Sequence, residues 1–289
     1  MLLAFDRISD GAGTDSTVDI VVLHGILGSG RNWRSVARQL SLGRPDLGVA
    51  TVDLRNHGRS QRLPGRDDIA ACCDDLDALV AAGAMRPSIV IGHSFGGKVA
   101  MEWTRRRPSA LTQMWVLDAL PGGSAAVADD SGIVGAVNDV RAVLAMVAAV
   151  DVPAASRAAI TAQLRSLGAS ASMADWLGTS VEQRDNGATW VFEAERIAAM
   201  LDDYAQLDSW DVLERPPQGV DVHFVRAGLS PRWSSTEIAR LAAFGPTSAS
   251  VWTLPAAGHW LHVDDPAGLL ALVLAHLPKA LPDDAVQCA

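Results

Sequence analysis

Ser94 is the residue whose surroundings in this sequence are most clearly arranged for chemistry. It lies at the centre of Gly92-His93-Ser94-Phe95-Gly96, between an apolar strand-forming run and a segment of helical character. At the apex of such a strand-turn-helix, the positions two before and two after the serine come so close that side chains would clash, and glycine at both positions removes the clash. The turn exposes the hydroxyl above the strand end and places the N–H groups of the next helix beside it. We therefore expect Ser94 to act as a nucleophile.

A serine nucleophile needs a base, and histidine is the usual one. His259 follows the last strand-like segment, residues 250–254. Asp118 ends another strand-like run, residues 114–117, on what we expect to be the same edge of a parallel sheet. We predict that His259 takes the Ser94 proton and later protonates the leaving group, while Asp118 holds the imidazole in the right tautomer and stabilises its cation.

The acid could instead follow the next strand-like segment, residues 220–226. The loop after it, residues 227–235, contains no carboxylate. Asp221 lies at the opposite end of the strand, roughly 15 Å from the catalytic edge at about 3.3 Å per residue. Glu237 fits the first turn of the following helix, where the helix dipole favours an acid. Asp118 is therefore the predicted acid, and its alternative role is to cap the turn that follows it.

A glycine-rich loop, residues 24–30, follows the strand-like residues 20–23. Loops at the carboxyl ends of parallel strands are where α/β proteins place their sites. The glycines could also cradle a phosphate, but the sequence has neither G-x-x-x-x-G-K-[ST] nor a clean G-x-G-x-x-G. A second loop, residues 55–60, carries His57. Because turn-forming residues surround His57, we expect it to bond to the backbone and not to act in chemistry.

Strand-like and helical segments alternate along most of the chain. This alternation predicts an α/β fold with a mostly parallel central sheet flanked by helices on both faces. Strands are expected near residues 2–8, 20–23, 49–54, 89–91, 114–118, 220–226 and 250–254. Between residues 121 and 217 the pattern becomes alanine-rich and helical in period, without a convincing strand. We expect a core domain of residues 1–120 and 218–289, with residues 121–217 inserted as a helical cap (lid).

Composition narrows the classes of partner and compartment. The 289 residues suit one large α/β domain with an insertion. A formal net charge of -9 argues against nucleic acid and anionic membranes as partners, and no apolar run is long enough to predict a membrane span. Cys72, Cys73 and Cys288 do not suggest a disulfide framework, and the N-terminus shows no signal-peptide pattern. We therefore expect a cytoplasmic protein, and the sequence leaves open whether it forms a homo-oligomer.

Four segments of the sequence together resemble the compact α/β-hydrolase esterases of the YbfF type. They are His24-Gly25-Ile26-Leu27-Gly28-Ser29, Asp53-Leu54-Arg55-Asn56-His57-Gly58, Gly92-His93-Ser94-Phe95-Gly96-Gly97-Lys98 and Gly258-His259-Trp260-Leu261-His262. The resemblance covers nearly the whole core, from about residue 18 to residue 275, but not the cap. It implies a nucleophile elbow at Ser94, an acyl-serine intermediate, and no metal or organic cofactor. It also implies an oxyanion hole formed by the backbone N–H groups of Ile26 and Phe95.

The residues that contact the substrate are harder to assign. Tryptophans in the cap and in the core loops favour an apolar pocket, although such residues more often serve packing. The cap contains Trp176, Trp190 and Trp210, and the core loops contain Trp233 and Trp260. We name His24, Trp233 and Trp260 as candidates for substrate contact.

The leading functional prediction is a carboxylesterase-type serine hydrolase acting on a small-molecule ester or thioester. The same catalytic residues could serve carbon–carbon bond hydrolysis, a lyase step or perhydrolysis, and a binding protein could use the pocket with little turnover. Epoxide hydrolase and haloalkane dehalogenase chemistry is disfavoured, because those hydrolases of this fold need a carboxylate at the position of Ser94. Rates on p-nitrophenyl esters and acyl-CoA thioesters of graded length would separate these readings.

Overall fold

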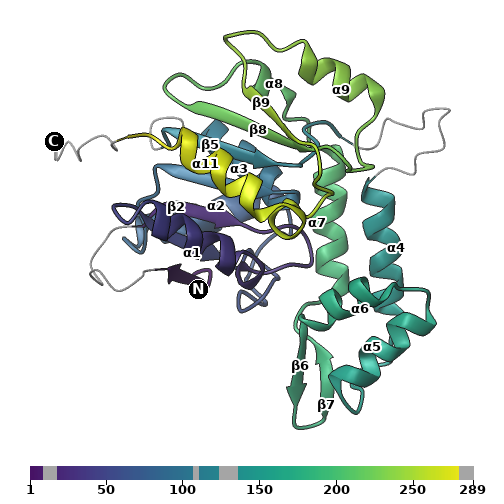
Figure 1. The fold of residues 1–289 in the computed structure, drawn as a ribbon. Coiled ribbons are helices and arrows are strands. Elements are labelled where there is room, and N and C mark those ends of the chain that lie inside the picture. The colour runs from purple at the N-terminus through teal and green to yellow at the C-terminus, as the bar shows by residue number, and fades with distance from the viewer. Residues whose placement is uncertain (9–17, 107–110, 124–135, 280–289) are drawn as a thin grey trace.

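A seven-stranded sheet forms the centre of the protein (Figure 1). The computed structural model describes residues 1–8, 18–106, 111–123 and 136–279. The strands are β1 (Phe5–Ile8), β2 (Val18–Leu23), β3 (Gly48–Val52), β4 (Ile89–His93), β5 (Gln113–Leu117), β8 (Asp221–Ala227) and β9 (Ser250–Leu254). They lie in the order β1-β3-β2-β4-β5-β8-β9, and only β1 pairs antiparallel with its neighbour. The mostly parallel sheet predicted from the sequence is confirmed.

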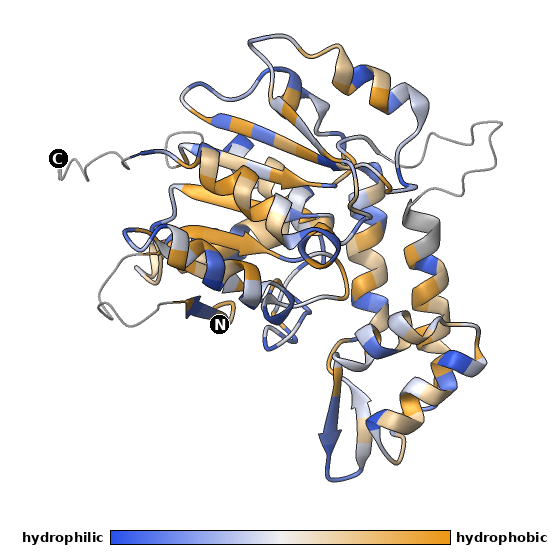
Figure 2. Ribbon diagram, viewed as in Figure 1, coloured by the Kyte–Doolittle hydropathy of each residue, from blue (hydrophilic) through white to orange (hydrophobic). Residues whose placement is uncertain are grey.

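Helices cover both faces of this sheet. One face carries α1 (Arg34–Gly43), preceded by the short helix η1 (Gly30–Trp33), together with α11 (Pro266–His276); the other carries α2 (Ile69–Ala81) and α3 (Phe95–Arg106). Strand β2 shows why two layers form. Ile20 and Val22 pack under α1 and α11, whereas Val21 and Leu23 pack under α2 and α3. Because successive side chains of a strand point to opposite faces, an unbroken apolar run needs cover on both sides. Figure 2 shows these apolar strands between the helices.

The segment between β5 and β8 contributes no strand to the seven-stranded sheet. Figure 1 shows α4 and α7 side by side next to the sheet, with α5, α6 and a small hairpin beyond them. The helices are α4 (Ala136–Ala148), α5 (Arg157–Ser166), α6 (Ala171–Gly178), α7 (Ala194–Gln206) and α8 (Trp210–Glu214). The side chains of Ser156 and Ser170 accept a backbone hydrogen bond at the starts of α5 and α6. Glu193 precedes α7 in an extended backbone conformation.

This segment also contains a β-hairpin, which corrects the expectation that it has no strand. Strand β6 (Val181–Arg184) pairs antiparallel with β7 (Gly187–Trp190). Asp185 and Asn186 connect the two strands, and Gly187 has φ of +126°, which only glycine adopts easily. Each strand is four residues long, too short to show a clear two-residue alternation in the sequence.

Two observations concern the expectations about membrane and compartment. Within the described ranges, no helix combines the length and the apolar character needed to cross a membrane. Cys72 and Cys73 are buried free thiols on α2, and burial raises the pKa of both. Cys288 lies outside the described residues.

Candidate active site

Ser94 lies in the sharp turn between β4 and α3. Its φ is +52°, a left-handed conformation that is strained for a residue with a side chain. A Cβ atom at Gly92 would overlap the carbonyl oxygen of Gly96, and a Cβ at Gly96 would lie 2.5 Å from the carbonyl oxygen of His24. The two glycines are thus required by the close approach of backbone that the sequence spacing predicted. The Ser94 N–H donates to the carbonyl of Leu117, which fixes the turn to β5.

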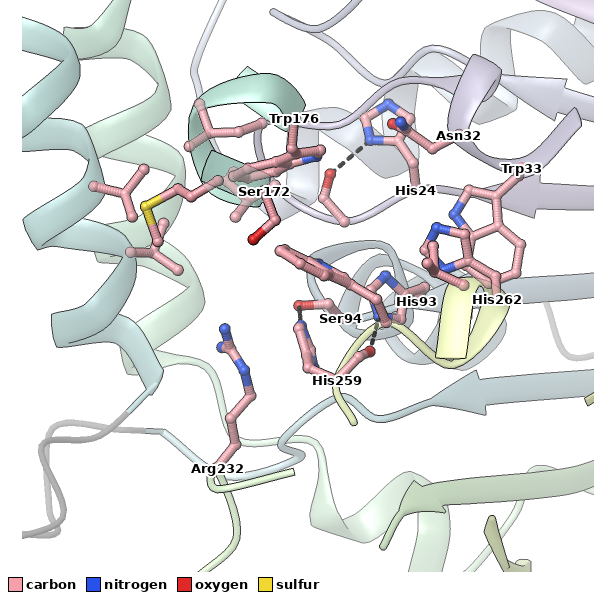
Figure 3. A pocket seen from close by; sticks show the side chains of 18 of the residues that line it. His24, Asn32, Trp33, His93, Ser94, Ser172, Trp176, Arg232, His259 and His262 are labelled. Carbon is pink, nitrogen blue, oxygen red and sulfur yellow. Dashed lines mark hydrogen bonds between the residues drawn. The ribbon is translucent and has the colours of Figure 1, made fainter. Parts of the chain in front are cut away.

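The structure brings Ser94, His259 and Asp118 into one line of hydrogen bonds. The His259 Nδ1 atom lies 2.8 Å from Asp118 Oδ2. His259 Nε2 lies 3.1 Å from Ser94 Oγ, a contact that is marked in Figure 3. An ionised carboxylate can only accept, so Nδ1 carries the proton and donates to Asp118. Nε2 is then free to accept from the Ser94 hydroxyl. The three side chains come from the ends of different strands, which meet at the carboxyl edge of the sheet.

Asp118 is a buried carboxylate with a full set of donors. Its Oδ1 accepts from the backbone N–H of Ala227 at 3.0 Å and from Trp233 Nε1 at 2.8 Å, while Oδ2 accepts from His259. Burial opposes ionisation, but the bonds from His259, Trp233 and Ala227 outweigh it and hold the pKa of Asp118 below its usual value. Asp118 is therefore ionised at neutral pH although only 2% of it is exposed.

Trp233 has a different position from the one we expected. We named it as a candidate for substrate contact, but it is buried and does not line the cavity beside Ser94. Its indole N–H points at Asp118 instead. A buried indole N–H needs an acceptor, and the carboxylate supplies a strong one. Trp233 thus holds the acid that orients His259.

His259 is prepared to accept a proton at neutral pH. Burial lowers its pKa; the bond to Asp118 acts in the opposite direction, and the positive charge of Arg232 lowers the pKa further. The net pKa lies below the ordinary 6.5, so the imidazole is neutral at pH 7. The His259 backbone is also fixed, because His93 Nε2 donates to its carbonyl oxygen at 2.8 Å. His93 thus connects the turn at Ser94 to the loop that carries His259.

The glycine-rich loop after β2 passes close to Ser94. A Cβ atom at Gly25 would lie 3.3 Å from the Ser94 Cβ. Leu27 has φ of +59°, and its N–H donates to His57 Nε2 at 3.0 Å. His57 Nδ1 donates in turn to the Arg55 carbonyl at 2.8 Å, so both ring nitrogens of His57 are bonded to backbone, as we expected. This arrangement fixes the loop that carries the N–H of Ile26.

His24 and Phe95 also take defined places around this loop. His24 Nε2 accepts from the N–H of Leu54 at 3.0 Å, and Nδ1 donates to the Gly25 carbonyl at 2.7 Å. The His24 ring therefore supports the loop, although it also lines the cavity. Phe95 is the first residue of α3, and the N–H groups of a first helical turn have no partner within the helix.

Lys98 ties the helix that follows Ser94 to the segment between β5 and β8. Its Nζ donates to three carbonyl oxygens, those of Gly122, Tyr204 and Leu207, at 2.8 to 2.9 Å. The ammonium group also lies 4.2 Å from the centre of the Tyr204 ring. Burial lowers the pKa of Lys98 to about 7. The start of α3 and the end of α7 are thereby held together.

A cavity of about 660 Å³ opens in front of Ser94 and His259. Helices α4 and α6 supply an apolar wall with Val140, Val143, Met146, Met173 and Trp176. Trp260 closes another side, with its ring centre 5.7 Å from that of Trp176. Of our three candidates for substrate contact, His24 and Trp260 line the cavity and Trp233 does not. Of the cap tryptophans, Trp176 lines it, whereas Trp190 and Trp210 do not.

Sequence reasoning missed four polar residues of this lining: Asn32, Ser172, Arg232 and His262. Arg232 lies in the loop of residues 227–235, where the sequence analysis considered only a possible catalytic carboxylate. His262 was in the segment that carries the family resemblance, and its ring stacks on Trp33 with centres 4.3 Å apart. Ser172 gave no signal, because a serine in the first turn of a helix is common. Figure 3 shows Ser172 and Arg232 at the space in front of Ser94, and His262 beside Trp33.

Comparison with known proteins places this chain in a family. The model of the alpha/beta hydrolase family matches residues 20–272. The chain belongs to the alpha/beta hydrolase family. This hydrolase is 29% identical over 276 residues to the sn-1-specific diacylglycerol lipase ABHD11 of Danio rerio, which covers 95% of this chain and 82% of the relative. It is 27% identical over 258 residues to the esterase YbfF of Escherichia coli (strain K12), covering 89% and 92% of the two chains.

A solved structure gives the same result. The hydrolase superposes on a marine microorganism esterase with a TM-score of 0.79 and 27% identity, covering 96% of this chain and 99% of the other. The resemblance to YbfF-type esterases is thus confirmed, and so is the α/β-hydrolase fold. Relatives that are named lipases and esterases support hydrolase activity for this chain.

Proposed function

We propose that this hydrolase cleaves carboxylic esters or thioesters through an acyl-serine intermediate. The observation that carries the proposal is the line of hydrogen bonds from buried Asp118 through His259 to Ser94 Oγ, at the wall of a cavity. A neutral imidazole beside a hydroxyl, oriented by a carboxylate on its other nitrogen, is the arrangement that activates a serine. The esterase and lipase relatives support the same chemistry.

In the first half of the reaction, Ser94 Oγ attacks the carbonyl carbon and its proton passes to His259 Nε2. The carbonyl oxygen becomes an oxyanion, for which we assign the backbone N–H groups of Ile26 and Phe95 as donors. Asp118 stabilises the imidazolium that forms. When the tetrahedral intermediate collapses, His259 gives its proton to the departing alcohol or thiol, and the acyl group stays on Ser94.

In the second half, a water molecule attacks the acyl carbon and His259 takes one of its protons. A second tetrahedral intermediate forms in the same oxyanion hole and collapses. His259 then returns the proton to Ser94 Oγ, and the carboxylic acid leaves. Every proton in this cycle moves through one nitrogen, Nε2. The proposed cycle assigns no step to a metal or an organic cofactor.

We further propose that residues 121–217 form a cap domain on a core of residues 1–120 and 218–289. The apolar side chains that α4 and α6 place in the cavity wall support this division. The cap would then select the substrate while the core performs the reaction. The cytoplasmic location and a homo-oligomeric state stay predictions from the sequence.

The choice of acid is tested by comparing two single variants on one activated ester. Asp118→Asn should lower kcat by on the order of 10² to 10⁴, because the amide cannot hold His259 in the same tautomer. Glu237→Gln should stay near wild type, since Glu237 caps α9 (Ser235–Ala242) through Ser234. The reverse ranking would move the acid to Glu237. Analysis of the products distinguishes ester hydrolysis from carbon–carbon cleavage, a lyase step or perhydrolysis.

A further inference from the structure

The loop between β8 and α9 brings one cation into the cavity that contains Ser94. Arg232 lines this cavity, and its side chain extends toward the space in front of Ser94 and His259 (Figure 3). No carboxylate of the described residues lines the cavity. Burial lowers the pKa values of the lining histidines, which are His24, His93, His259 and His262. At neutral pH, Arg232 is therefore the one charged side chain that the described part of the chain contributes to the lining.

Arg232 is half-buried, yet the described part of the chain offers it no acceptor. Two other arginines that are buried or half-buried are paired: Arg55 with Asp75, and Arg196 with Asp67. No carboxylate or carbonyl oxygen among the described residues accepts a hydrogen bond from Arg232. Withdrawing a guanidinium from water without an acceptor costs free energy. A ligand that brings an anionic group to this position would offset that cost.

The backbone on both sides of Arg232 is anchored. Its neighbour Trp233 donates to Asp118, the carboxylate that also binds His259. Earlier in the loop, the N–H of Leu229 donates to the carbonyl of Ala257 at 2.9 Å. The base of the Arg232 side chain is thus held at a defined place relative to His259. A guanidinium presents two parallel N–H groups that match the two oxygens of a carboxylate, and a fixed base reduces the entropy lost on binding.

We propose that the site takes esters or thioesters that carry a carboxylate, which Arg232 binds while the apolar wall of α4 and α6 packs against the rest of the substrate. This inference rests on the proposed hydrolase function and adds the class of substrate. The carboxylate can lie on the acyl part or on the alcohol part, because both extend from the same scissile carbonyl. The chemistry recognised by Arg232 is the same in either case.

Matched pairs of esters test the proposal. On the acyl side, monoethyl esters of dicarboxylic acids from succinate to suberate are compared with ethyl esters in which the free carboxyl is an amide of equal length. On the alcohol side, the acetate ester of 6-hydroxyhexanoate is compared with that of 6-hydroxyhexanamide. Proton release gives kcat/KM for each. In at least one pair, the carboxylate should exceed its amide by about 10- to 100-fold at low salt, as expected for a charge-assisted bidentate contact.

The preference should depend on Arg232. Arg232→Gln should bring the ratio of kcat/KM for carboxylate over amide close to one, and Arg232→Glu should bring it below one by charge repulsion. Arg226→Gln is the matched control, because Arg226 is also half-buried and lies on β8 but lines a different cavity. It should keep the wild-type ratio. A thermal melt of each variant shows that it is folded.

Two outcomes overturn the inference. One is a wild-type ratio at or below one for every pair, and the other is a ratio above one that Arg232→Gln leaves unchanged. Hydrolysis of the neutral amide-containing esters that disappears in Ser94→Ala would still support the proposed function in both cases. If the wild-type enzyme hydrolysed neither member of any pair, both the inference and the proposed function would fail.

Discussion

Trp233→Phe tests whether the indole N–H contributes to catalysis through Asp118. The substitution removes the donor 2.8 Å from Asp118 Oδ1 and keeps an aromatic ring against Phe224, whose centre lies 5.5 Å away. Asp118 keeps its bonds from Ala227 N–H and from His259. With one donor of three lost, the carboxylate stabilises the His259 cation less and fixes the ring less firmly.

The size of the effect follows from the kind of bond. A hydrogen bond to a charged group contributes about 1.5–3 kcal/mol. Since two donors remain on Asp118, we take the lower end, which corresponds to a fall in kcat/KM of about tenfold if the full amount is expressed in the transition state. The pKa of Asp118 should also rise, because Trp233 is one of the groups that lower it.

Trp115→Phe is the matched control for this experiment. Trp115 is a fully buried tryptophan of β5, and its indole N–H donates to Gln113 Oε1 at 2.9 Å, away from the cavity. Both variants lose a buried hydrogen bond and some ring volume, so both should unfold at lower urea concentration. Only Trp233→Phe should lose activity on a p-nitrophenyl ester. The reasoning is refuted if Trp233→Phe stays within about twofold of wild type, or if Trp115→Phe loses as much.

Two further predictions concern pH and the cavity wall. His259 must be neutral to accept a proton, and its pKa lies below 6.5. In a profile from pH 4 to 8, kcat/KM should therefore rise with pH and level off, with its midpoint below 6.5. A midpoint above 7 would contradict this. Trp176→Ala should enlarge the cavity and change the ratio of kcat/KM for an octanoyl over an acetyl ester by about tenfold or more. Trp190 is buried and does not line the cavity, so Trp190→Phe should leave that ratio unchanged. An equal effect of both substitutions would mean that Trp176 only stabilises the fold.

The parts of the site that sequence reasoning placed correctly are those fixed by local geometry or by strand ends. Gly92 and Gly96 had to flank Ser94, because backbone atoms at those positions approach too closely for a side chain. Asp118 and His259 follow strands of one parallel sheet, and the carboxyl ends of such strands share an edge. Their convergence on Ser94 could therefore be anticipated from the order of elements alone.

The parts that were missed depend on contacts between segments far apart in the chain. The bond from Trp233 to Asp118 joins residues that are 115 positions apart, and a tryptophan in a loop looks the same whether it faces a substrate or a carboxylate. Arg232 is distinctive because it lines the cavity without an acceptor among the described residues, and no sequence pattern reports either fact. The hairpin of β6 and β7 was missed for a different reason: its strands are too short for a periodic signal.

Covalent labelling of Ser94 tests the central claim most directly. Wild-type protein is treated with a fluorophosphonate, and intact mass and peptide mapping locate the adduct. Ser172→Ala is the control, because Ser172 also lines the cavity. The account predicts one adduct per chain on Ser94, present in wild type and in Ser172→Ala, absent from folded Ser94→Ala, and formed in step with loss of ester hydrolysis. An adduct that persists in Ser94→Ala, or full hydrolysis by protein labelled at Ser94, would contradict it.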